Sequence, residues 1–483
     1  MALRKASAPG KPGCQPDSYR YRRMRKQMNR SSRWFRHFRV AVYAGIASVA
    51  CLSCSSNSYE GMVVAVELTE VKLDSYEGAK LIAIDIRNPG KPVKVLSEDF
   101  KSAASPSISH DGRYLYFQGK QTEDISWQIW VADLKKGSIS KVTSLPENCL
   151  QPAPLPDGTV IFSRETSIKG KLVSDLHRCQ MDGSELTRIT FNPALNIHAS
   201  VLQEGRVLYS SSEQYPDSKI PSLMVMRPDG TKSEIYYRGS QESFPFSGGE
   251  ESADGYIYFV ESHGQLCRVL HRRPLHTREN LSDALPGVFA AVYPMEESTN
   301  LVSYRPNQND PFALYTFDAS TREAPSLLYK GSGTITDPVL VAPMEKRPMI
   351  LPSPVEENNP TALLMSQNIN HSMTPVNQGI TGDTVADRIR VSTLDGELGV
   401  VEVKKDGSFY LKLDAETPLR IEALNSQGET VRGPSNWIYL RANERRACVG
   451  CHADPELSPI NTQPLAVKED PVVLHAKVKE TSN

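Results

Sequence analysis

A repeat of about 40 to 50 residues runs through the chain between about residues 60 and 345. In its clearest copy, Ser105–Phe117 contains the turn pair Asp111 and Gly112, and the apolar run Gln128–Asp133 follows. A polar turn next to an apolar run is typical of a β-hairpin. One such sheet cannot bury both of its faces, so the repeats must pack against one another, and a ring of blades is the arrangement that this period predicts.

Further copies continue the pattern. Four of them, the last one degenerate, begin at Pro156, Gln203, Ala253 and Thr299. Residues 63–96 supply part of another copy, and residues 337–342 are expected to complete its sheet and close the ring. We therefore predict an all-β propeller over residues 60–345, with six blades or alternatively seven.

The repeats, most clearly the copy that begins at Ser105, resemble the WD40-like repeats of Tol-system propellers. This copy carries their order of a Ser-Pro start, an Asp-Gly turn, a Leu-Tyr-Phe strand and an Ile-Trp strand that ends in Asp. The resemblance implies the fold and says little about function. Propellers of this kind more often serve as a scaffold or a binding surface than as a catalyst.

A second region of short strands follows the repeats. Residues 346–386 contain four prolines between Pro348 and Pro360 and are predicted to form a stiff linker. Within residues 387–447, runs of alternating apolar and polar residues are separated by Asp-Gly and Gln-Gly pairs, which indicates strands with one buried face. The expected strands are residues 388–392, 399–403, 408–413, 419–424 and 437–440. We predict a small β-sandwich or barrel that leads into a haem motif and tail at residues 448–483.

A C-x-x-C-H motif closes this region, with Cys448, Cys451 and His452 as its functional positions. In an exported protein this motif attaches c-type haem, because the two thiols form thioethers to the vinyl groups and the imidazole ligates the iron. We predict one covalent haem c here. The alternatives are a redox or structural disulfide and half of a zinc site. A zinc site needs a second Cys or His pair nearby, whereas His475 alone follows the motif.

Attachment of haem c takes place outside the cytoplasm, and the start of the chain fits export. A basic stretch, Arg33–Arg39, precedes an apolar run, Val40–Leu52, that is shorter than the roughly 20 residues a membrane span requires. We predict a leader and signal peptide over residues 1–54, with translation starting at Met1 or at Met28.

Cys54 and the Ser-rich stretch after it resemble a bacterial lipoprotein cleavage site, although Leu52 and Ser53 depart from the usual residues. Lipidation at Cys54, a plain cleaved signal and an uncleaved anchor are the alternatives. The first predicts a periplasmic or cell-envelope lipoprotein that meets the membrane only through its lipid.

Net charge and cysteine content limit the classes of partner and of covalent cross-link that this chain can have. The formal net charge of -1 argues against a nucleic-acid partner. Eight cysteines are too few and too scattered for a disulfide scaffold. Outside the leader and the haem motif, Cys149, Cys179 and Cys267 remain, so at most one pair can bridge, and we expect buried free thiols.

The stretch from Asp406 to Glu456 resembles the middle domain of hydrazine synthase alpha subunits and related exported propeller cytochromes. In that group a β-domain ends in Glu-Arg-x-x-Cys-x-x-Cys-His, matched here from Glu444 to His452. The propeller before it fits as well. The resemblance implies a haem-bearing redox protein. The resemblance also implies a second haem domain and a Tyr after the motif that takes part in ligating the reactive haem. This chain has a single motif and no Tyr after His452, so the resemblance alone does not imply hydrazine chemistry.

Residues around the motif have two readings each. Arg445 and Arg446 are candidates to pair with the haem propionates, since a guanidinium forks well onto a carboxylate; otherwise they are solvated surface residues. Trp437 and Tyr439 either line the haem or belong to the core of the last strand.

The sixth iron ligand decides the chemistry, since Met or His there makes an electron carrier and an open position permits substrate chemistry. The candidates are Met365, His371 and Met373 in the linker, His475 in the tail, and His198, which is expected to face the central channel of the propeller. The sequence does not rank them.

Three functions follow. The first is an exported cytochrome that transfers electrons while its propeller docks a redox partner protein. The second is an oxidoreductase subunit with an open haem, as the resemblance suggests. The third is a haem-less, lipid-anchored propeller that acts as a binding or scaffold module, with the Cys pair oxidised. Substrate and oligomeric state are not encoded in any motif.

Overall fold

The computed structural model describes residues 59–69, 76–122, 124–296, 298–450, 454, 456–457 and 461–475, which belong to one compact unit, Ser56–Asn483. The predicted leader with Cys54, and the motif residues Cys451 and His452, lie outside the described residues. Regular structure in the described part is β-strand, apart from two short 3-10 turns, η1 (Ser262–Gly264) and η2 (Leu465–Lys468). The predicted all-β class is confirmed.

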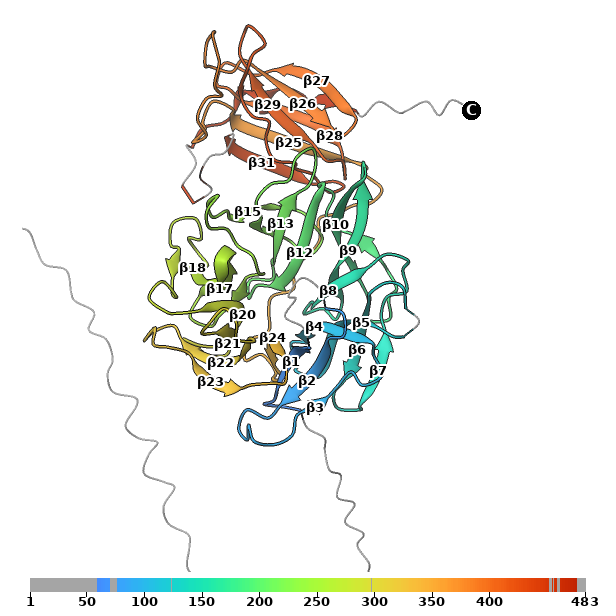
Figure 1. Cartoon of the computed structure of the whole chain (residues 1–483). Helices are drawn as coiled ribbons and strands as arrows, with labels where there is room; N and C mark the ends of the chain where they lie inside the picture. The colour runs from blue at the N-terminus through green and yellow to red at the C-terminus, as the bar shows by residue number, and fades with distance from the viewer. Residues whose placement is uncertain are drawn as a thin grey trace, which may run out of the picture. The chain divides into compact units, whose positions relative to one another are not determined.

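The repeats form sheets of antiparallel strands arranged around a common centre (Figure 1). The first four groups are β1 (Val63–Leu68), β2 (Lys80–Ile84) and β3 (Lys94–Val95); β4 (Ser102–Ile108), β5 (Tyr114–Lys120), β6 (Gln128–Asp133) and β7 (Ser138–Lys141); β8 (Cys149–Pro154), β9 (Val160–Ile168), β10 (Lys171–Cys179) and β11 (Thr187–Arg188); and β12 (Ala194–Val201), β13 (Val207–Glu213), β14 (Ser222–Met226) and β15 (Glu234–Tyr237). The remaining groups are β16 (Glu250–Glu251), β17 (Tyr256–Glu261), β18 (Gln265–Leu270) and β19 (Glu279–Asn280); β20 (Val288–Pro294), β21 (Thr299–Arg305), β22 (Ala313–Asp318) and β23 (Ser326–Tyr329); and the single strand β24 (Thr334–Leu340). In the sheet of β1 to β3 the innermost strand is the last of the region, β24, whereas in the other sheets the strand nearest the centre comes first in the chain and the following strands continue outward.

The ring closes as predicted. Strand β24 pairs antiparallel with β1, from Val63 opposite Leu340 to Leu68 opposite Thr334, and so completes the sheet of β1 to β3. One end of the repeat region is thereby hydrogen-bonded to the other. The number of blades stays a prediction, because Ser174 of β10 pairs in parallel with Leu195 of β12 and joins two strand groups into one eight-stranded sheet.

The central strands are buried on both faces because each sheet packs between two neighbours. All six residues of β6, from Gln128 to Asp133, are buried. The cysteines that the sequence left unpaired, Cys149, Cys179 and Cys267, are buried free thiols, which confirms the expectation.

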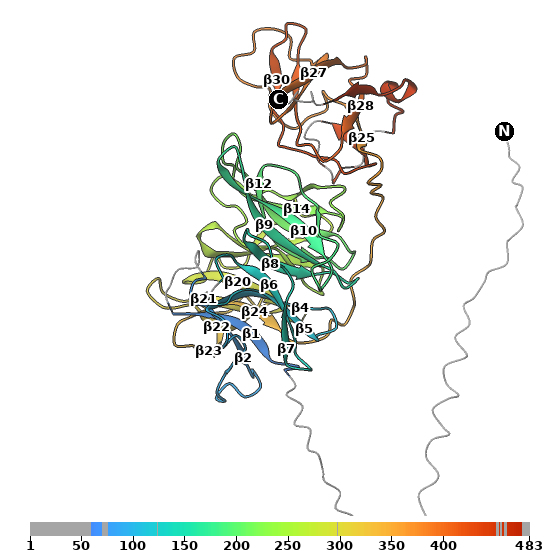
Figure 2. The same cartoon turned by 90° about the vertical axis from the view of Figure 1, so that its right-hand side faces the viewer.

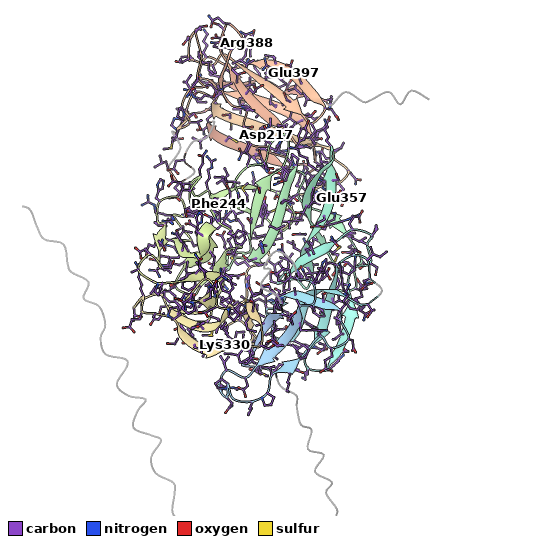
Figure 3. The ribbon with its side chains drawn as sticks, viewed as in Figure 1. Asp217, Phe244, Lys330, Glu357, Arg388 and Glu397 are labelled. Carbon is purple, nitrogen blue, oxygen red and sulfur yellow. The ribbon has the colours of Figure 1, made fainter. Side chains whose placement is uncertain are left out.

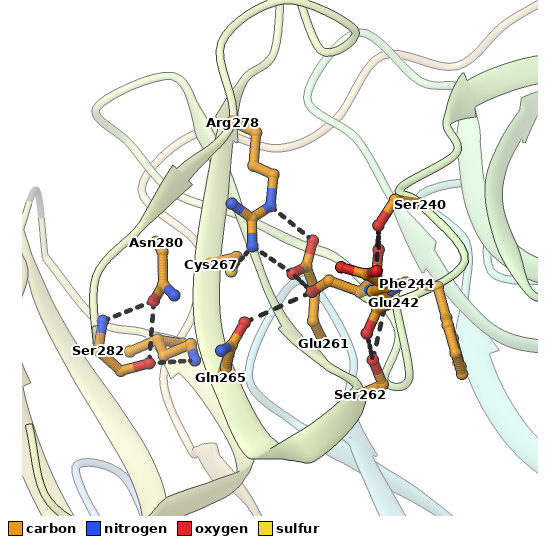
Figure 4. A network of polar contacts seen from close by, with 12 residues as sticks. Ser240, Glu242, Phe244, Glu261, Ser262, Gln265, Cys267, Arg278, Asn280 and Ser282 are labelled. Carbon is orange, nitrogen blue, oxygen red and sulfur yellow. Dashed lines mark hydrogen bonds and ion pairs between the residues drawn. The ribbon is translucent and has the colours of Figure 1, made fainter.

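One buried carboxylate of the propeller, Glu261, is fully paired. Glu261, at the end of β17, has no exposed surface and binds the guanidinium of Arg278 through both carboxylate oxygens, at 2.9 and 2.6 Å (Figure 4). The hydroxyl of Tyr237 donates to the same carboxylate at 2.8 Å. A buried carboxylate without such partners would be strongly destabilising, so this network holds the loops around β17 to β19 in place.

The C-terminal region is a β-sandwich of two four-stranded sheets (Figure 2). Their orders are β31-β25-β28-β32 and β27-β26-β29-β30, and their facing residues share one apolar core. The strands are β25 (Thr361–Asn368), β26 (Arg388–Thr393), β27 (Gly396–Glu402), β28 (Phe409–Asp414), β29 (Arg420–Leu424), β30 (Thr430–Arg432), β31 (Arg445–Gly450) and β32 (Val472–Leu474). Arg390 of β26 forms ion pairs with Glu397 and Glu422, at 3.0 Å each. Figure 3 labels Glu397 on this domain.

Two strand predictions need correction here. Strand β25 lies inside residues 346–386, which were predicted as a linker; it pairs with both β28 and β31 and contributes Ala362 and Leu364 to the core. Residues 437–440, predicted as a strand, form only a single bridge, between Ile438 and Leu419. The side chains of Trp437 and Tyr439 face the propeller, whereas Ile438 and Leu440 pack in the sandwich core.

Candidate functional site

The haem motif begins on β31, at the edge of the sandwich. This strand runs parallel to β25, with Cys448 opposite Ser366 and Gly450 opposite Asn368. The partly exposed Cys448 packs against the sandwich core, and burial raises the pKa of its thiol. A raised pKa disfavours the thiolate that thiol–disulfide exchange requires.

The turn after β25 lies directly against the motif. A Cβ atom added to Gly450 would stand 2.1 Å from the carbonyl oxygen of His371. The side chains of His371 and Met373, on this turn, are exposed. Met365, on β25, lies opposite Ala447 of β31. The structure therefore brings three of the predicted ligand candidates beside the motif, and Met365 sits on a strand rather than in a flexible linker.

His475 is not among them. It follows β32, which runs parallel to β28, and its ring bonds to Asp414 at 2.7 Å. Asp414 is opposite Thr361, at the far end of β25 from Asn368 and Gly450. At about 3.3 Å per residue, the two ends of this sheet are about 20 Å apart. His475 as an iron ligand stays a prediction; in this arrangement its ring is paired with Asp414, away from the described residues of the motif.

His198 faces the centre of the propeller, as the sequence predicted. Its Nε2 lies 3.2 Å from the side-chain nitrogen of Gln151, and its backbone N–H donates to the Gln151 side-chain oxygen at 2.9 Å. Burial lowers the pKa of His198 to about 4, so the ring is neutral at pH 7. It lines a central cavity and belongs to a site different from that of the haem motif.

The chain just before the motif is fixed to the propeller by Glu444, which is buried. Its carboxylate accepts hydrogen bonds from the backbone N–H groups of Lys232, at 3.0 Å, and Arg441, at 2.9 Å. The guanidinium of Arg446 binds the same carboxylate at 2.8 Å and is largely buried, whereas Arg445 is exposed. Of the two predicted partners of the haem propionates, Arg445 is therefore the one with an exposed side chain. The Lys232 ammonium group donates a hydrogen bond to the backbone carbonyl of Arg445 at 2.5 Å.

The chain just after the motif is fixed to the propeller as well. Asp454 pairs with the ring of His276 at 2.6 Å, and Glu456 accepts the Leu275 backbone N–H at 2.7 Å and pairs with Arg273 at 3.4 Å. The backbone N–H of Glu456 and the His276 ring lower the pKa of Asp454. Arg273, His276 and Lys232 were not predicted from the sequence, because no local pattern connects residues about 180 or more positions apart.

Trp437 and Tyr439 are buried at the contact with the propeller. The Trp437 indole donates to the Tyr215 carbonyl at 2.7 Å, and its backbone N–H donates to Glu213 at 2.5 Å. The Tyr439 ring lies 5.6 Å from that of Phe191. They therefore belong to the interface between the two β-domains, a role that neither prediction included.

Two absences apply to the described residues. No cluster of three or more His, Cys, Asp or Glu side chains within them is placed to hold a metal ion. None of them forms a helix that is long and apolar enough to cross a membrane.

Comparisons with known proteins agree with the predicted resemblance. Residues 364–453 match the sequence profile of the hydrazine synthase alpha subunit middle domain. Hydrazine synthase subunit alpha of Kuenenia stuttgartiensis is 21% identical over 78% of this chain and 62% of its own length. The chain thus spans less than two thirds of that relative.

Among solved structures, Kuenenia stuttgartiensis hydrazine synthase superposes with a TM-score of 0.73 at 18% identity, covering 84% of this chain and 71% of the other. This shows a shared fold of propeller and following domain. TolB from Acinetobacter baumannii matches with a TM-score of 0.41 at 17% identity, over 58% of this chain and 66% of its own, which is too weak to argue from.

Proposed function

We propose that this chain is an exported redox protein with a hydrazine synthase-like role, which carries one covalent haem c on Cys448 and Cys451, with His452 as the iron ligand. The observation that supports the proposal most is the placement of the motif. Chain segments on both sides of it, at Glu444 and at Asp454 to Glu456, are fastened to the propeller. A loop held at both ends offers a fixed site to a rigid ring system.

The donor set fits haem c better than the alternatives. Cys448 is part of a thiol pair next to an imidazole, and its raised pKa disfavours exchange chemistry. Haem c, when bound, supplies one-electron redox chemistry. Around it, Arg445 and Lys232 offer positive charge for the propionates, and His371, Met373 and Met365 are the remaining candidates for the sixth ligand. A sixth ligand from this turn would favour electron transfer; an open position would favour substrate chemistry.

The similarity to hydrazine synthase subunit alpha also supports a proposal about protein partners. The similar protein from Kuenenia stuttgartiensis is a subunit, so it works within an assembly. We propose that the propeller of this chain docks a redox partner protein in a comparable way. A lipid anchor at Cys54 would hold the chain at the membrane surface.

The test is a pyridine haemochrome spectrum of the denatured, acid–acetone-extracted protein, exported from a host with cytochrome c maturation machinery. We expect a c-type band in the wild type and in Cys179→Ala, which removes a buried thiol outside the motif. The band should vanish in Cys448→Ala/Cys451→Ala. A well-folded wild type without covalent haem would overturn the proposal and leave a propeller that acts in binding.

The spin state of the native protein then separates the two redox roles. We expect a six-coordinate, low-spin spectrum that becomes high-spin in His371→Ala or in Met373→Ala. Gln378→Ala, at an exposed position of the same segment, is the control. Native high-spin haem that binds carbon monoxide would support substrate chemistry instead.

A further inference from the structure

The propeller has a central cavity of about 550 Å³ that is open to solvent. The strand nearest the centre in each group contributes to its wall, namely β4, β8, β12, β16, β20 and β24. A cavity of this volume has the size of sites that hold small organic molecules. It is separate from the haem motif, and none of the arguments above uses it.

Four wall residues adopt a left-handed backbone although none of them is glycine. They are Ser105, Gln151, His198 and Asp337, with φ between 48° and 53°. Each sits where its strand slips by a bulge or where the pairing register shifts. A bulge re-aims a side chain, and the recurrence of this costly conformation around one cavity shows that the wall of the cavity is built to a common plan.

The charge of the wall has one sign. Four carboxyl groups line the cavity, and no Lys or Arg does within the described part of the chain. Three of them have partners: Glu77 binds Lys120 at 3.0 Å, Glu165 accepts from Asn148 at 2.7 Å, and Asp337 accepts from Tyr76 at 2.9 Å. The fourth, Glu250, has no hydrogen-bond or ion-pair partner among the described residues.

Glu250 is held toward the cavity by its strand. Successive residues of a strand point to opposite faces, and its neighbour Glu251 points away and accepts the Gln203 backbone N–H at 2.5 Å. Just before them, Gly248 approaches His198 so closely that a Cβ atom would stand 2.8 Å from the His198 Cβ. The close approach fixes the position of β16 beside β12.

Glu250 is partly buried, and no described side chain compensates its charge. Burial raises the pKa of its carboxyl group to about 7, so near pH 7 the group is partly ionised. Tyr293, with a pKa raised to about 12, interacts with Glu250, and His198, with a pKa lowered to about 4, lines the same cavity, so both are neutral there. The other titratable groups of the wall are Tyr76 and the carboxyl groups of Glu77, Glu165 and Asp337, which add no positive charge. A buried carboxylate is stabilised by a cation, and none of the wall residues supplies one.

The remaining wall combines neutral polar side chains with an apolar and aromatic part. Ile197, Ala291, Val292 and the ring of Tyr293 line it, and Phe246, which is 61% exposed, contributes a second ring. Apolar surface suits an alkyl chain, and aromatic faces attract organic cations. A bound metal ion is not supported, because no three ligating side chains converge in the described residues.

We propose that the central cavity of the propeller binds a protonated primary alkylamine, with its ammonium group on Glu250 and its alkyl chain against Val292 and Ile197. The ammonium group provides the three donors and the positive charge that the wall lacks. The site is independent of the haem and of the proposed redox role.

The probe is n-butylammonium chloride, titrated into the full-length protein at pH 8, where Glu250 is ionised. We expect the thermal midpoint to rise with the logarithm of the n-butylammonium concentration above the apparent dissociation constant, and this constant to increase about tenfold between pH 8 and pH 6, as the carboxylate gains a proton. Controls are n-butanol, which has the same chain length without the charge, and potassium chloride at equal ionic strength. Neither control should produce this rise.

Two variants test the role of Glu250. Glu250→Gln should lower the affinity for n-butylammonium at least tenfold at pH 8, while Glu251→Gln, whose side chain points away from the cavity, should keep it. Glu250→Asp retains the charge and serves if Glu250→Gln does not fold. Equal binding by Glu250→Gln and wild type, or an equal shift with n-butanol, would overturn the proposal. Retained haem content in Glu250→Gln would show that any loss of binding is local to the cavity.

Discussion

At the scale of single residues, Glu250 makes stability depend on pH in an unusual direction. Its pKa in the folded chain is about 7, against an ordinary value of about 4.3 in an unfolded chain. The folded state therefore binds the proton more tightly. The stabilisation from this proton is complete below the unfolded pKa and is lost as the pH rises through about 7. We expect the wild type to lose about 3 kcal/mol relative to Glu250→Gln between pH 4.5 and pH 8.

Urea unfolding of wild type and Glu250→Gln at several pH values in this range measures the difference. Taking the difference also removes the contributions of His198 and Asp337, whose pKa values are shifted by burial in both proteins. A difference that stays constant with pH would mean that the Glu250 carboxyl is solvated and ordinary. The same result would weaken the case for an ammonium ligand in the cavity.

Some residues that line the central cavity could be predicted from the sequence, and others could not. His198 was placed at the central channel because the blade period fixes which strand is innermost. The other left-handed wall residues were not predicted, although the sequence contains a signal: the innermost strands repeat a polar residue before proline at Ser105, Gln151 and Asp337. Glu250 carries no such signal, since its importance comes from the absence of a partner, which only the packed structure shows.

At the scale of elements, the contact between β31 and the turn after β25 depends on Gly450. Replacing Gly450 by Ala would bring a Cβ atom to 2.1 Å from the His371 carbonyl oxygen, so the turn or the strand must move. We expect Gly450→Ala to destabilise the sandwich by about 1–3 kcal/mol, as overpacking does, and to reduce the covalent haem content of exported protein.

Gly90→Ala is the matched control, because a Cβ atom there meets nothing within 4 Å. Chemical unfolding and the haem-to-protein ratio measure both effects. An unchanged haem content in a destabilised Gly450→Ala would show that the turn is needed for stability but not for the shape of the attachment site. Unchanged stability would show that the turn adapts without cost.

The elements of the sandwich were predictable only in part, for physical reasons. Strands β26, β28 and β29 show a clean alternation of buried and exposed residues, which the sequence displays directly. Strand β25 was hidden by the prolines around it, which suggested a linker. Residues 437–440 alternate like a strand, but Trp437 and Tyr439 are apolar because they meet the propeller, so the pattern reports an interface.

At the scale of the whole molecule, the propeller and the sandwich are joined by buried polar contacts. Glu213 of β13 is buried and binds both the Trp437 backbone N–H, at 2.5 Å, and the Arg420 guanidinium, at 2.9 Å. Arg420 in turn lies 4.5 Å from the centre of the Trp437 ring. No local sequence pattern reveals this interface, because its residues are more than 200 positions apart and each looks like an ordinary strand residue.

Removing Glu213 therefore tests whether the two β-domains unfold together. Glu213→Ala leaves the largely buried Arg420 without its partner carboxylate, and breaking such a pair costs about 3–5 kcal/mol. We expect the sandwich to loosen from the propeller, so that calorimetry resolves two unfolding transitions in place of one and limited proteolysis cuts between residues 341 and 360.

Glu357→Ala, at an exposed position labelled in Figure 3, is the control and should behave as the wild type. Because the segments on both sides of the haem motif are fastened to the propeller, a loosened sandwich should also raise the solvent access of the haem. A single, unshifted transition in Glu213→Ala would mean that Glu444 and the Asp454 to Glu456 segment hold the domains together without it.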